Sequence, residues 1–362
     1  MSSYSVSLRF TTTPGLEDIT AGELRERLSA GASAAGDGGD FEIEPKPLDL
    51  DGHVMLHTGR TQAQLRPTVF NMRSCFHIIR HITSLQMRET DPLGALEEEL
   101  KSLDVAEMRS ASAFRVTTNR SGSHSFKSMD VQRVAGAALV ERYGTAVDLE
   151  GFDTEVRVDA VGATWLIGVQ WTRDSLDKRY PWVYRPRVTL RTTIAYAMLR
   201  LADLPAEAPT ILDPFCGSAT ILIEAASVRA DVRCLAADRD TEAVIGAHAN
   251  ADAVGLSDRI DIREADARDL AETYPPASVD AVVTNPPYGI RLGKHANYTE
   301  LYRKFLSGAA AVLKPGGRLV VLVGKRRAIF NRVLREQPEF RIVNVRVIEI
   351  GGVYPAVFVL QR

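Results

Sequence analysis

Four consecutive residues, Asn285-Pro286-Pro287-Tyr288, have the composition of a pocket for a planar group that carries an NH2. The run at 279–284 before them is short, rich in β-branched residues and bounded by turn residues, which predicts a buried parallel strand. Because the two prolines permit neither a helix nor further ladder pairing, Asn285 and Tyr288 must lie at the carboxyl end of that strand. In an open α/β sheet, ligands bind at this end. These residues therefore predict the binding of an amine by an amide, a backbone carbonyl and an aromatic ring.

A second motif, at 212–220, lies between a predicted strand and a predicted helix and has small residues around Gly217. Such a turn lets the backbone approach a ligand and exposes helix N-terminal NH groups to a carboxylate. Asp213, at the end of the strand, can accept a hydrogen bond from an ammonium group. A single glycine-rich segment of this kind is also compatible with an ordinary strand-to-helix turn.

Two further acids follow at the ends of the next predicted strands. Asp238 follows Gly217 at about the 20-residue spacing at which an acid binds ribose hydroxyls. Asp266 follows the strand predicted at 260–263, where it can accept a hydrogen bond from an adenine amine. Three acids at strand ends around one glycine turn predict a nucleoside site rather than a structural turn.

The elements that position both motifs alternate regularly. From residue 188 to residue 336, predicted helices and strands follow one another in turn, which indicates a doubly wound parallel sheet. The tail differs, because 341–350 and 353–360 are predicted strands joined by a tight glycine turn, hence an antiparallel hairpin. The chain before residue 188 mixes strands and helices in α+β order.

The composition is that of a globular protein. The chain has 362 residues, 45% of them apolar and 25% charged, which is enough for two or three domains with their own cores. It has neither an apolar run long enough for a membrane span nor the pattern of a signal peptide. Cys75, Cys216 and Cys234 are odd in number and widely spaced, so we expect no disulfide framework, no metal site and a reducing cytoplasm.

The formal net charge of −2 conceals a local basic cluster. Between residues 173 and 191 only Asp174 and Asp177 oppose the basic residues Arg173, Lys178, Arg179, Arg185, Arg187 and Arg191. Such a cluster in a near-neutral chain favours contact with a polyanion, although a solvated linker would have the same composition. Lys325 and Arg326, which follow the strand predicted at 318–323, are a second candidate phosphate contact.

DPFCGSAT at 213–220 together with NPPYG at 285–289 resembles motifs I and IV of the amino-methyltransferases, whose methyl donor is S-adenosylmethionine (SAM). The resemblance implies a Rossmann-like class I SAM-dependent methyltransferase domain. It also implies that the side-chain oxygen of Asn285 and the carbonyl of Pro286 accept hydrogen bonds from the target NH2, while Tyr288 stacks on its planar group. The enzyme would then act by positioning and electrostatics, with no metal.

The same resemblance assigns residues to the cofactor site. These are Asp213, Phe215, Gly217, Ser218, Ala219, Thr220, Asp238, Arg239, Asp266, Ala267 and Asn285. Ala219 departs from the family, which usually has glycine there. We expect its methyl group to be tolerated only if φ is negative.

The N-terminal half resembles the THUMP-bearing RNA methyltransferases at 13–17, in the strand at 114–116 with its arginine-containing loop, and at 175–179. The implied architecture is a ferredoxin-like domain at 1–64, a THUMP domain at 65–172, a basic linker at 173–187 and the methyltransferase domain at 188–362. The resemblance places RNA contacts at Arg120, Lys127, Lys178, Arg179, Arg185, Arg187, Lys325 and Arg326.

The full architecture is similar to that of the TrmN-type tRNA guanine-N2 methyltransferases, which modify position 6 in the acceptor stem. This implies a monomeric cytoplasmic enzyme that grips the tRNA acceptor end through its THUMP domain. Enzymes that act on guanine N2 in large-subunit rRNA or at tRNA position 10 share parts of the architecture, although the latter typically begin motif IV with Asp. Amino methylation of DNA or of a protein glutamine, and RNA binding without catalysis, stay open as alternatives.

Overall fold

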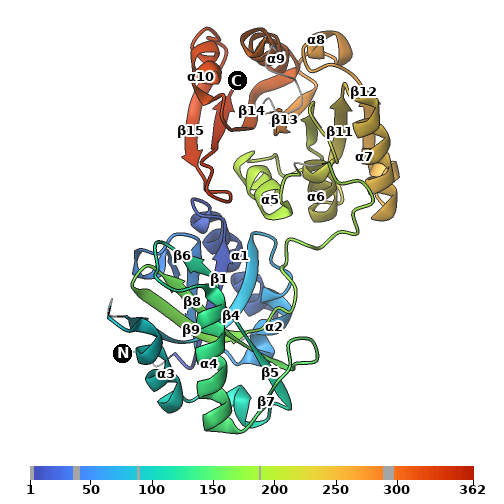
Figure 1. Ribbon diagram of the computed structural model, residues 1–362. Coiled ribbons are helices and arrows are strands. Elements are labelled where there is room, and N and C mark those ends of the chain that lie inside the picture. Colours follow the sequence, from blue (N-terminus) through green and yellow to red (C-terminus); the bar gives the residue numbers. More distant parts are fainter. Residues whose placement is uncertain (1–3, 36–40, 88–89, 187–188, 288–296) are drawn as a thin grey trace. The chain divides into compact units, whose positions relative to one another are not determined.

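The computed structural model describes residues 4–35, 41–87, 90–186, 189–287 and 297–362, without the side chains of 31–35 (Figure 1). The chain divides into two compact units. The first consists of Met1–Thr12 with Thr20–Leu176, and the second of Thr13–Ile19 with Asp177–Arg362. Each unit is built on its own β-sheet.

One sheet runs through the whole first unit. Its strands in the described residues are β1 (Val6–Thr12), β2 (Phe41–Pro45), β3 (His53–Thr58), β4 (Cys75–Gln86), β5 (Ala113–Thr117), β6 (Arg120–Ser121), β7 (Ala146–Val147), β8 (Thr154–Val161) and β9 (Thr164–Gln170). Their order is β2-β3-β1-β4-β9-β8-β5-β7, with β6 beside β8. The antiparallel β1–β4 pair joins the segments that the sequence assigned to a ferredoxin-like and a THUMP domain. The two segments therefore share one sheet, and the boundary between residues 64 and 65 stays a prediction.

Helices and short 3-10 turns accompany this sheet. They are α1 (Glu17–Ala35), η1 (Pro47–Asp49), α2 (Gln62–Val69), α3 (Pro92–Ser102), η2 (Ala106–Arg109) and α4 (Ser128–Tyr143). Leu24 of α1 and Phe10 of β1 belong to one hydrophobic core. Leu139 of α4 and Trp165 of β9 belong to another. Each core thus lies between an apolar strand face and helices, but the first core also includes Cys75 and Ile78 of β4, beyond the predicted boundary at residue 64.

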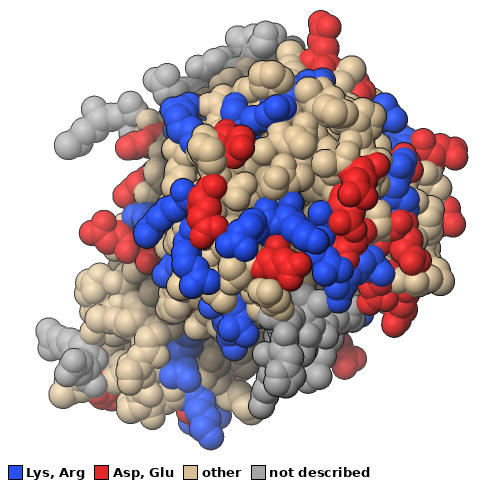
Figure 2. Space-filling view, turned by 90° about the horizontal axis from the view of Figure 1, so that it is seen from above, with Lys and Arg blue, Asp and Glu red and all other residues tan. Residues whose placement is uncertain are grey.

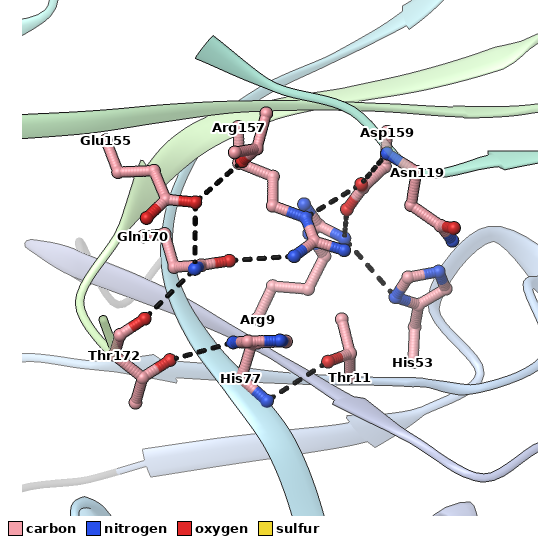
Figure 3. Close-up of polar contacts among 11 residues, drawn as sticks. Arg9, Thr11, His53, His77, Asn119, Glu155, Arg157, Asp159, Gln170 and Thr172 are labelled. Carbon is pink, nitrogen blue, oxygen red and sulfur yellow. Dashed lines mark hydrogen bonds and ion pairs between the residues drawn. The ribbon is translucent and has the colours of Figure 1, made fainter. Parts of the chain in front are cut away.

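Polar residues that alternate with the apolar ones along β1 and β8 form a network in which Arg9, Arg157 and Asp159 bond to one another (Figure 3). Arg9 Nη1 lies 2.6 Å from Asp159 Oδ2 and 3.3 Å from His53 Nδ1. Arg157 Nε donates to the other carboxylate oxygen of Asp159 at 2.8 Å. Burial alone would raise the pKa of Asp159, but Arg9 and Arg157 outweigh it and hold this pKa at about 2. The guanidinium of Arg9 thus connects β1 to β8 across the two strands between them.

The second unit contains the predicted doubly wound sheet. Its strands are β10 (Thr210–Asp213), β11 (Arg233–Asp238), β12 (Ile260–Glu264), β13 (Val279–Thr284), β14 (Leu313–Val323), β15 (Arg341–Val347) and β16 (Ala356–Gln361). Their order is β12-β11-β10-β13-β14-β16-β15. The pairs from β12 to β14 are parallel, whereas β16 is antiparallel to both β14 and β15.

Helices bury both faces of this sheet. They are α5 (Thr192–Leu201), α6 (Thr220–Val228), α7 (Thr241–Ala253), α8 (Leu270–Thr273), α9 (Tyr298–Val312) and α10 (Arg327–Leu334), with a 3-10 turn η3 (Ser257–Arg259). Val283 belongs to the core that contains α5, α6 and α7, whereas its neighbour Val282 belongs to the core that contains α8, α9 and α10. Where both faces are covered the strands contain continuous apolar runs, as in β16, whereas the edge strand β15 is largely exposed.

The terminal hairpin depends on two glycines. Gly351 has φ +57° and Gly352 has φ +81°, and Ile350 and Val353 form a β-bridge on either side of them. Two successive positive φ angles match the twist of a tight antiparallel hairpin. The predicted parallel sheet that closes in an antiparallel hairpin is confirmed.

Replacement of Asp159 by asparagine should lower the free energy of unfolding by about 3–5 kcal/mol, because Arg9 would be left buried without its counter-charge. Urea unfolding at neutral pH measures this loss. Asp51→Asn is the control, since Asp51 is 65% exposed in its ion pair with Lys46 and should matter by about 1 kcal/mol or less. Equal unfolding energies for Asp159→Asn and the original protein would contradict the expectation.

The same ion pair makes a pH prediction. The folded-state pKa of Asp159 is depressed, so its contribution to stability is present above the ordinary pKa near 3.8 and disappears as the pH falls through about 2. The stability difference between the original protein and Asp159→Asn should therefore shrink across that interval.

Candidate active site

The two sequence motifs meet where the order of the parallel strands reverses. β10 pairs with β11 on one side and with β13 on the other, with Leu212 opposite Val282. The turn after β10 and the residues after β13 therefore leave the sheet at the same carboxyl edge. In doubly wound sheets this switch point is where ligands bind.

The turn after β10 is held by hydrogen bonds that its backbone NH groups donate to Asp213 and to β11. Phe215 N donates to Asp213 Oδ1 at 3.1 Å, and Cys216 N donates to Ala237 O at 2.9 Å. Gly217 has φ +52°, and a Cβ atom added to it would meet nothing within 4 Å. The turn thus presents open, side-chain-free backbone beside a carboxylate, which fits the methionine end of SAM.

Cys216 in this turn is a buried thiol. Burial, followed by the charges of Asp213 and Asp238, raises the pKa of Cys216 well above its ordinary value. A protonated thiol is a poor nucleophile, so the chemistry of the site does not pass through Cys216.

Ala219 contradicts our expectation of a negative φ. Its φ is +60° and its ψ is 22°, in the left-handed region, where it is the N-cap of α6. Its NH donates to Cys216 O at 2.7 Å, and its side chain is fully buried. The left-handed conformation costs about 1–2 kcal/mol. Burial of the methyl group, about 0.8 kcal/mol, and the hydrogen bond of the turn offset that cost.

Asp238, at the end of β11, bonds to the turn. Its Oδ2 accepts a hydrogen bond from Gly217 N at 3.0 Å, and its Oδ1 accepts one from Asp240 N at 3.1 Å. Burial raises the pKa of Asp238, against the lowering effect of these two donors. This geometry suits the predicted ribose contact, which stays a prediction.

Asp266 lies after β12 and is held by Arg268. Arg268 Nη2 donates to Asp266 Oδ2 at 2.6 Å, and this side-chain bond is the largest cause of the lowered pKa of Asp266. The carboxylate is therefore ionised and oriented, as an acceptor for an amine requires. Ala267 beside it is buried and Arg239, after β11, is exposed.

The acceptor half of the site follows β13. Asn285 is half-buried and Pro286 is buried, while Tyr288 lies outside the described residues. Thr284, the last residue of β13, donates its hydroxyl hydrogen to Asp213 Oδ1 at 2.6 Å. This contact joins the two motifs directly, and no motif or spacing in the sequence indicated it.

An aromatic ring and an arginine lie at the same edge of the sheet. Tyr298, at the start of α9, is 4% exposed, and the guanidinium of Arg326, after β14, lies 4.8 Å from its ring centroid. Neither the Tyr298 hydroxyl nor Arg326 Nε has a hydrogen-bond partner among the described residues. Sequence reasoning found Arg326 through its charge and missed Tyr298, which belongs to no motif.

From Asp177 onward the basic segment belongs to the second unit and packs within it, which its charge did not predict. Arg179 Nη1 donates to Glu224 Oε1 at 3.2 Å, and the Tyr180 hydroxyl donates to Glu224 Oε2 at 2.8 Å. Glu224, in α6, is fully buried. Arg179, predicted to contact RNA, is therefore engaged inside the protein.

Asn250 joins the same segment to the cofactor turn. Its Oδ1 accepts hydrogen bonds from Val183 N at 3.0 Å and Tyr184 N at 2.8 Å, and its Nδ2 donates to Ser218 O at 3.1 Å. Asn250 is fully buried in α7. Asn250 is one of several polar residues in α7, so nothing in the sequence singles it out for such a role. On the other side of Ser218, its hydroxyl lies 3.0 Å from that of Thr220.

The other predicted RNA contacts differ in exposure. Those exposed to solvent are Arg120, Lys127, Lys178, Arg185 and Lys325. Arg326 is half-buried, and Arg187 lies outside the described residues. On the face drawn in Figure 2, basic and acidic side chains are interspersed rather than separated by sign.

Within the described ranges, no group of three or more His, Cys, Asp or Glu residues could hold a metal ion. None of the helices described has both the length and the apolar character to cross a membrane. Cys75, Cys216 and Cys234 are buried free thiols.

Comparison with known proteins places this site in a family. A family model described as the RMKL-like methyltransferase domain matches residues 183–356, and a THUMP domain model matches residues 93–170. A tRNA (guanine(6)-N2)-methyltransferase of Thermus thermophilus is 39% identical over 98% of the chain and 99% of the relative. The chain therefore belongs to the family of this relative, the TrmN-type methyltransferases with a THUMP domain.

Two further relatives agree with the assignment. An Archaeoglobus fulgidus protein of the same name is 28% identical over 99% of the chain and 93% of the relative. The crystal structure of TrmN from Thermus thermophilus, 38% identical, matches over 99% of both chains with a TM-score of 0.77. The predicted resemblance to TrmN-type methyltransferases with a THUMP domain is confirmed. The domain boundaries predicted at residues 172 and 187 stay predictions.

Asp238→Ala should weaken SAM binding by about 10- to 100-fold, because it removes a charged acceptor and the carboxylate that holds Gly217 N. Isothermal titration calorimetry with SAM measures the change. Asp258→Ala is the matched control, since Asp258 is an exposed acid in η3, at the amino end of β12. Unchanged SAM affinity in Asp238→Ala would remove this residue from the ribose role.

Proposed function

We propose that the protein transfers a methyl group from SAM to the exocyclic N2 of a guanosine in tRNA, at position 6 of the acceptor stem. The observation that carries the proposal is similarity along 98% of the chain to a tRNA (guanine(6)-N2)-methyltransferase. The local geometry supports it, because the glycine turn and Asn285 emerge at neighbouring strand ends of the switch point.

Each half of the site has its own task. SAM supplies an electrophilic methyl group. Asp213, Asp238 and the backbone around Gly217 hold the donor, and the Asn285 side-chain oxygen with the Pro286 carbonyl accepts hydrogen bonds from the target NH2. Those bonds orient the N2 lone pair, which is otherwise delocalised into the purine ring. The protein acts here by orientation and by fixed dipoles.

The first unit supplies the RNA contact in this proposal. The THUMP domain holds the acceptor end of the tRNA, with the exposed Arg120 and Lys127 among its phosphate contacts. The protein works as a cytoplasmic monomer, a compartment that suits its three free thiols.

The test of the proposal is methylation in vitro. Purified protein, labelled SAM and unmodified tRNA are incubated, and the tRNA is digested to nucleosides and mapped by mass spectrometry. We expect label in N2-methylguanosine at position 6. Label only in N6-methyladenosine, or transfer to rRNA, DNA or a release factor while tRNA stays inert, would overturn the substrate assignment.

Asn285→Ala should lower kcat on tRNA by about 100-fold or more, since a group that orients the reacting amine matters most in the transition state. The affinity for tRNA should stay nearly unchanged, which a filter-binding titration checks. Asn344→Ala is the control, because Asn344 is an exposed asparagine on the edge strand β15. A kcat close to that of the original protein would exclude Asn285 from the acceptor site.

Replacing Arg185 and Arg187 by alanine should weaken tRNA binding and make it less dependent on salt. The slope of log binding constant against log salt concentration should become shallower by about 0.9 for each phosphate that loses its cationic partner. Arg233→Ala is the control, because Arg233 is exposed at the amino end of β11, away from the ligand edge. An unchanged slope would mean that this segment is a solvated linker.

A further inference from the structure

Thr284 occupies the junction of the two motifs. It is the last residue of β13, immediately before Asn285, and it is fully buried. Its hydroxyl donates to Asp213 Oδ1 at 2.6 Å, which is short for an O–H···O bond and typical of a carboxylate acceptor. Asp213 is itself only 2% exposed. One buried hydrogen bond thus links the acid of the cofactor turn to the residue that precedes the acceptor-site amide.

The bond orients the carboxylate of Asp213. Oδ1 accepts hydrogen bonds from both Thr284 Oγ1 and Phe215 N, whereas no described residue donates to Oδ2. Thr284 is β-branched, which restricts the χ1 rotamers open to its hydroxyl. Fixing Oδ1 in this way leaves Oδ2 as the oxygen available to an ammonium group at the turn.

The pKa of Asp213 depends on this hydrogen bond as well as on burial and nearby charges. The pKa of Asp213 is raised to about 7, because burial and, to a smaller extent, the charge of Asp238 outweigh the lowering effect of the hydrogen bonds from Thr284 and Phe215 N. The other titratable groups that face it, Cys216 in the turn and Tyr274 after α8, both have raised pKa values and are neutral at pH 7. Thr284 is therefore a principal group that favours the ionised form.

We propose that Thr284 is a positioning residue that couples the two halves of the active site through its hydrogen bond to Asp213. By holding this carboxylate oriented and ionised, Thr284 favours capture of the ammonium group of SAM. By the same bond, the end of β13 is fixed against β10, which sets the place of Asn285. The inference deepens the proposed function and depends on its cofactor, but not on the choice of RNA.

The first experiment measures SAM affinity by calorimetry at pH values from about 5.5 to about 9, in the full-length protein, Thr284→Val and Thr284→Ser. In the original protein, binding should weaken as the pH falls through about 7, because protonated Asp213 does not attract an ammonium group. Thr284→Val preserves shape without a donor and should move this midpoint upward by about one pH unit. Thr284→Ser keeps the donor and should restore the original midpoint.

Asp213→Asn isolates the cause. An asparagine oxygen still accepts the Thr284 hydrogen but does not titrate, so the loss of SAM affinity toward low pH should largely disappear. In the Asp213→Asn background, Thr284→Val should no longer shift the pH dependence of SAM affinity. The titration of Asp238 is present in all variants and therefore does not distinguish them. A purely structural Thr284 would instead weaken SAM binding equally at every pH. That outcome, or an equal shift in the Asp213→Asn background, would overturn the proposal.

A kinetic readout tests the coupling to Asn285. At saturating SAM and pH 8, Thr284→Val should lower kcat on tRNA while tRNA affinity stays constant, and its effect should be smaller when combined with Asn285→Ala than by itself. An unchanged kcat would remove the acceptor half of the proposal.

Two outcomes are kept apart by this design. If Thr284→Val does not fold, as circular dichroism would show, Asp213→Asn alone decides, and a pH dependence of SAM affinity equal to that of the original protein would overturn the inference. If tRNA is not methylated but the pH shift is found, the RNA assignment fails and the role of Thr284 in the cofactor site stands.

Discussion

The pairing of β10 with β13 is the constraint on which the active site depends. Parallel strands cannot be joined by a tight turn, so the chain leaves β10 through α6 and returns to β13 only after two further strands. The reversal of strand order at this pair brings Asp213 and Asn285 to one edge although they are far apart in the sequence. The hydrogen bond between Thr284 and Asp213 then ties the two strand ends together within the core. The donor and acceptor sites thus lie at the adjacent carboxyl ends of one packed strand pair. Their relative position is therefore set by the sheet and not by independent loops.

Buried polar side chains fix the alignment of strands and segments that apolar packing alone does not determine. In the first unit, the ion pair of Arg9 and Asp159 links strands from both halves of the sheet. In the second, Glu224 and Asn250 hold the segment that precedes α5. Such groups cost desolvation and contribute little net stability when fully paired. Their effect lies in register, because a slip of one residue would leave a charge or an amide buried without its partner.

The candidate site was predictable to the extent that local spacing encodes it. The glycine turn, Asp213 and Asp238 were predicted from their positions at strand ends, and the structure brings them together, while their roles stay predictions. Three features had no local signal. Thr284 and Asn250 act through partners distant in sequence, and Tyr298 meets Arg326 only because the ends of two elements converge. Local charge was also an incomplete guide. Arg179 was predicted to contact RNA from the basic cluster around it, and the structure shows it paired with a buried glutamate.

By itself, the sequence determined the alternation of strands and helices, the two chemical motifs and the antiparallel hairpin at Gly351 and Gly352. These are consequences of periodicity and of backbone preference, which act over a few residues. Only the tertiary structure decided that two predicted N-terminal domains share one sheet, and that Ala219 keeps a left-handed backbone against its preference. The reason is common to both. Strand pairing and burial join residues distant in the chain, and their combined energy exceeds the local preferences on which sequence reasoning depends.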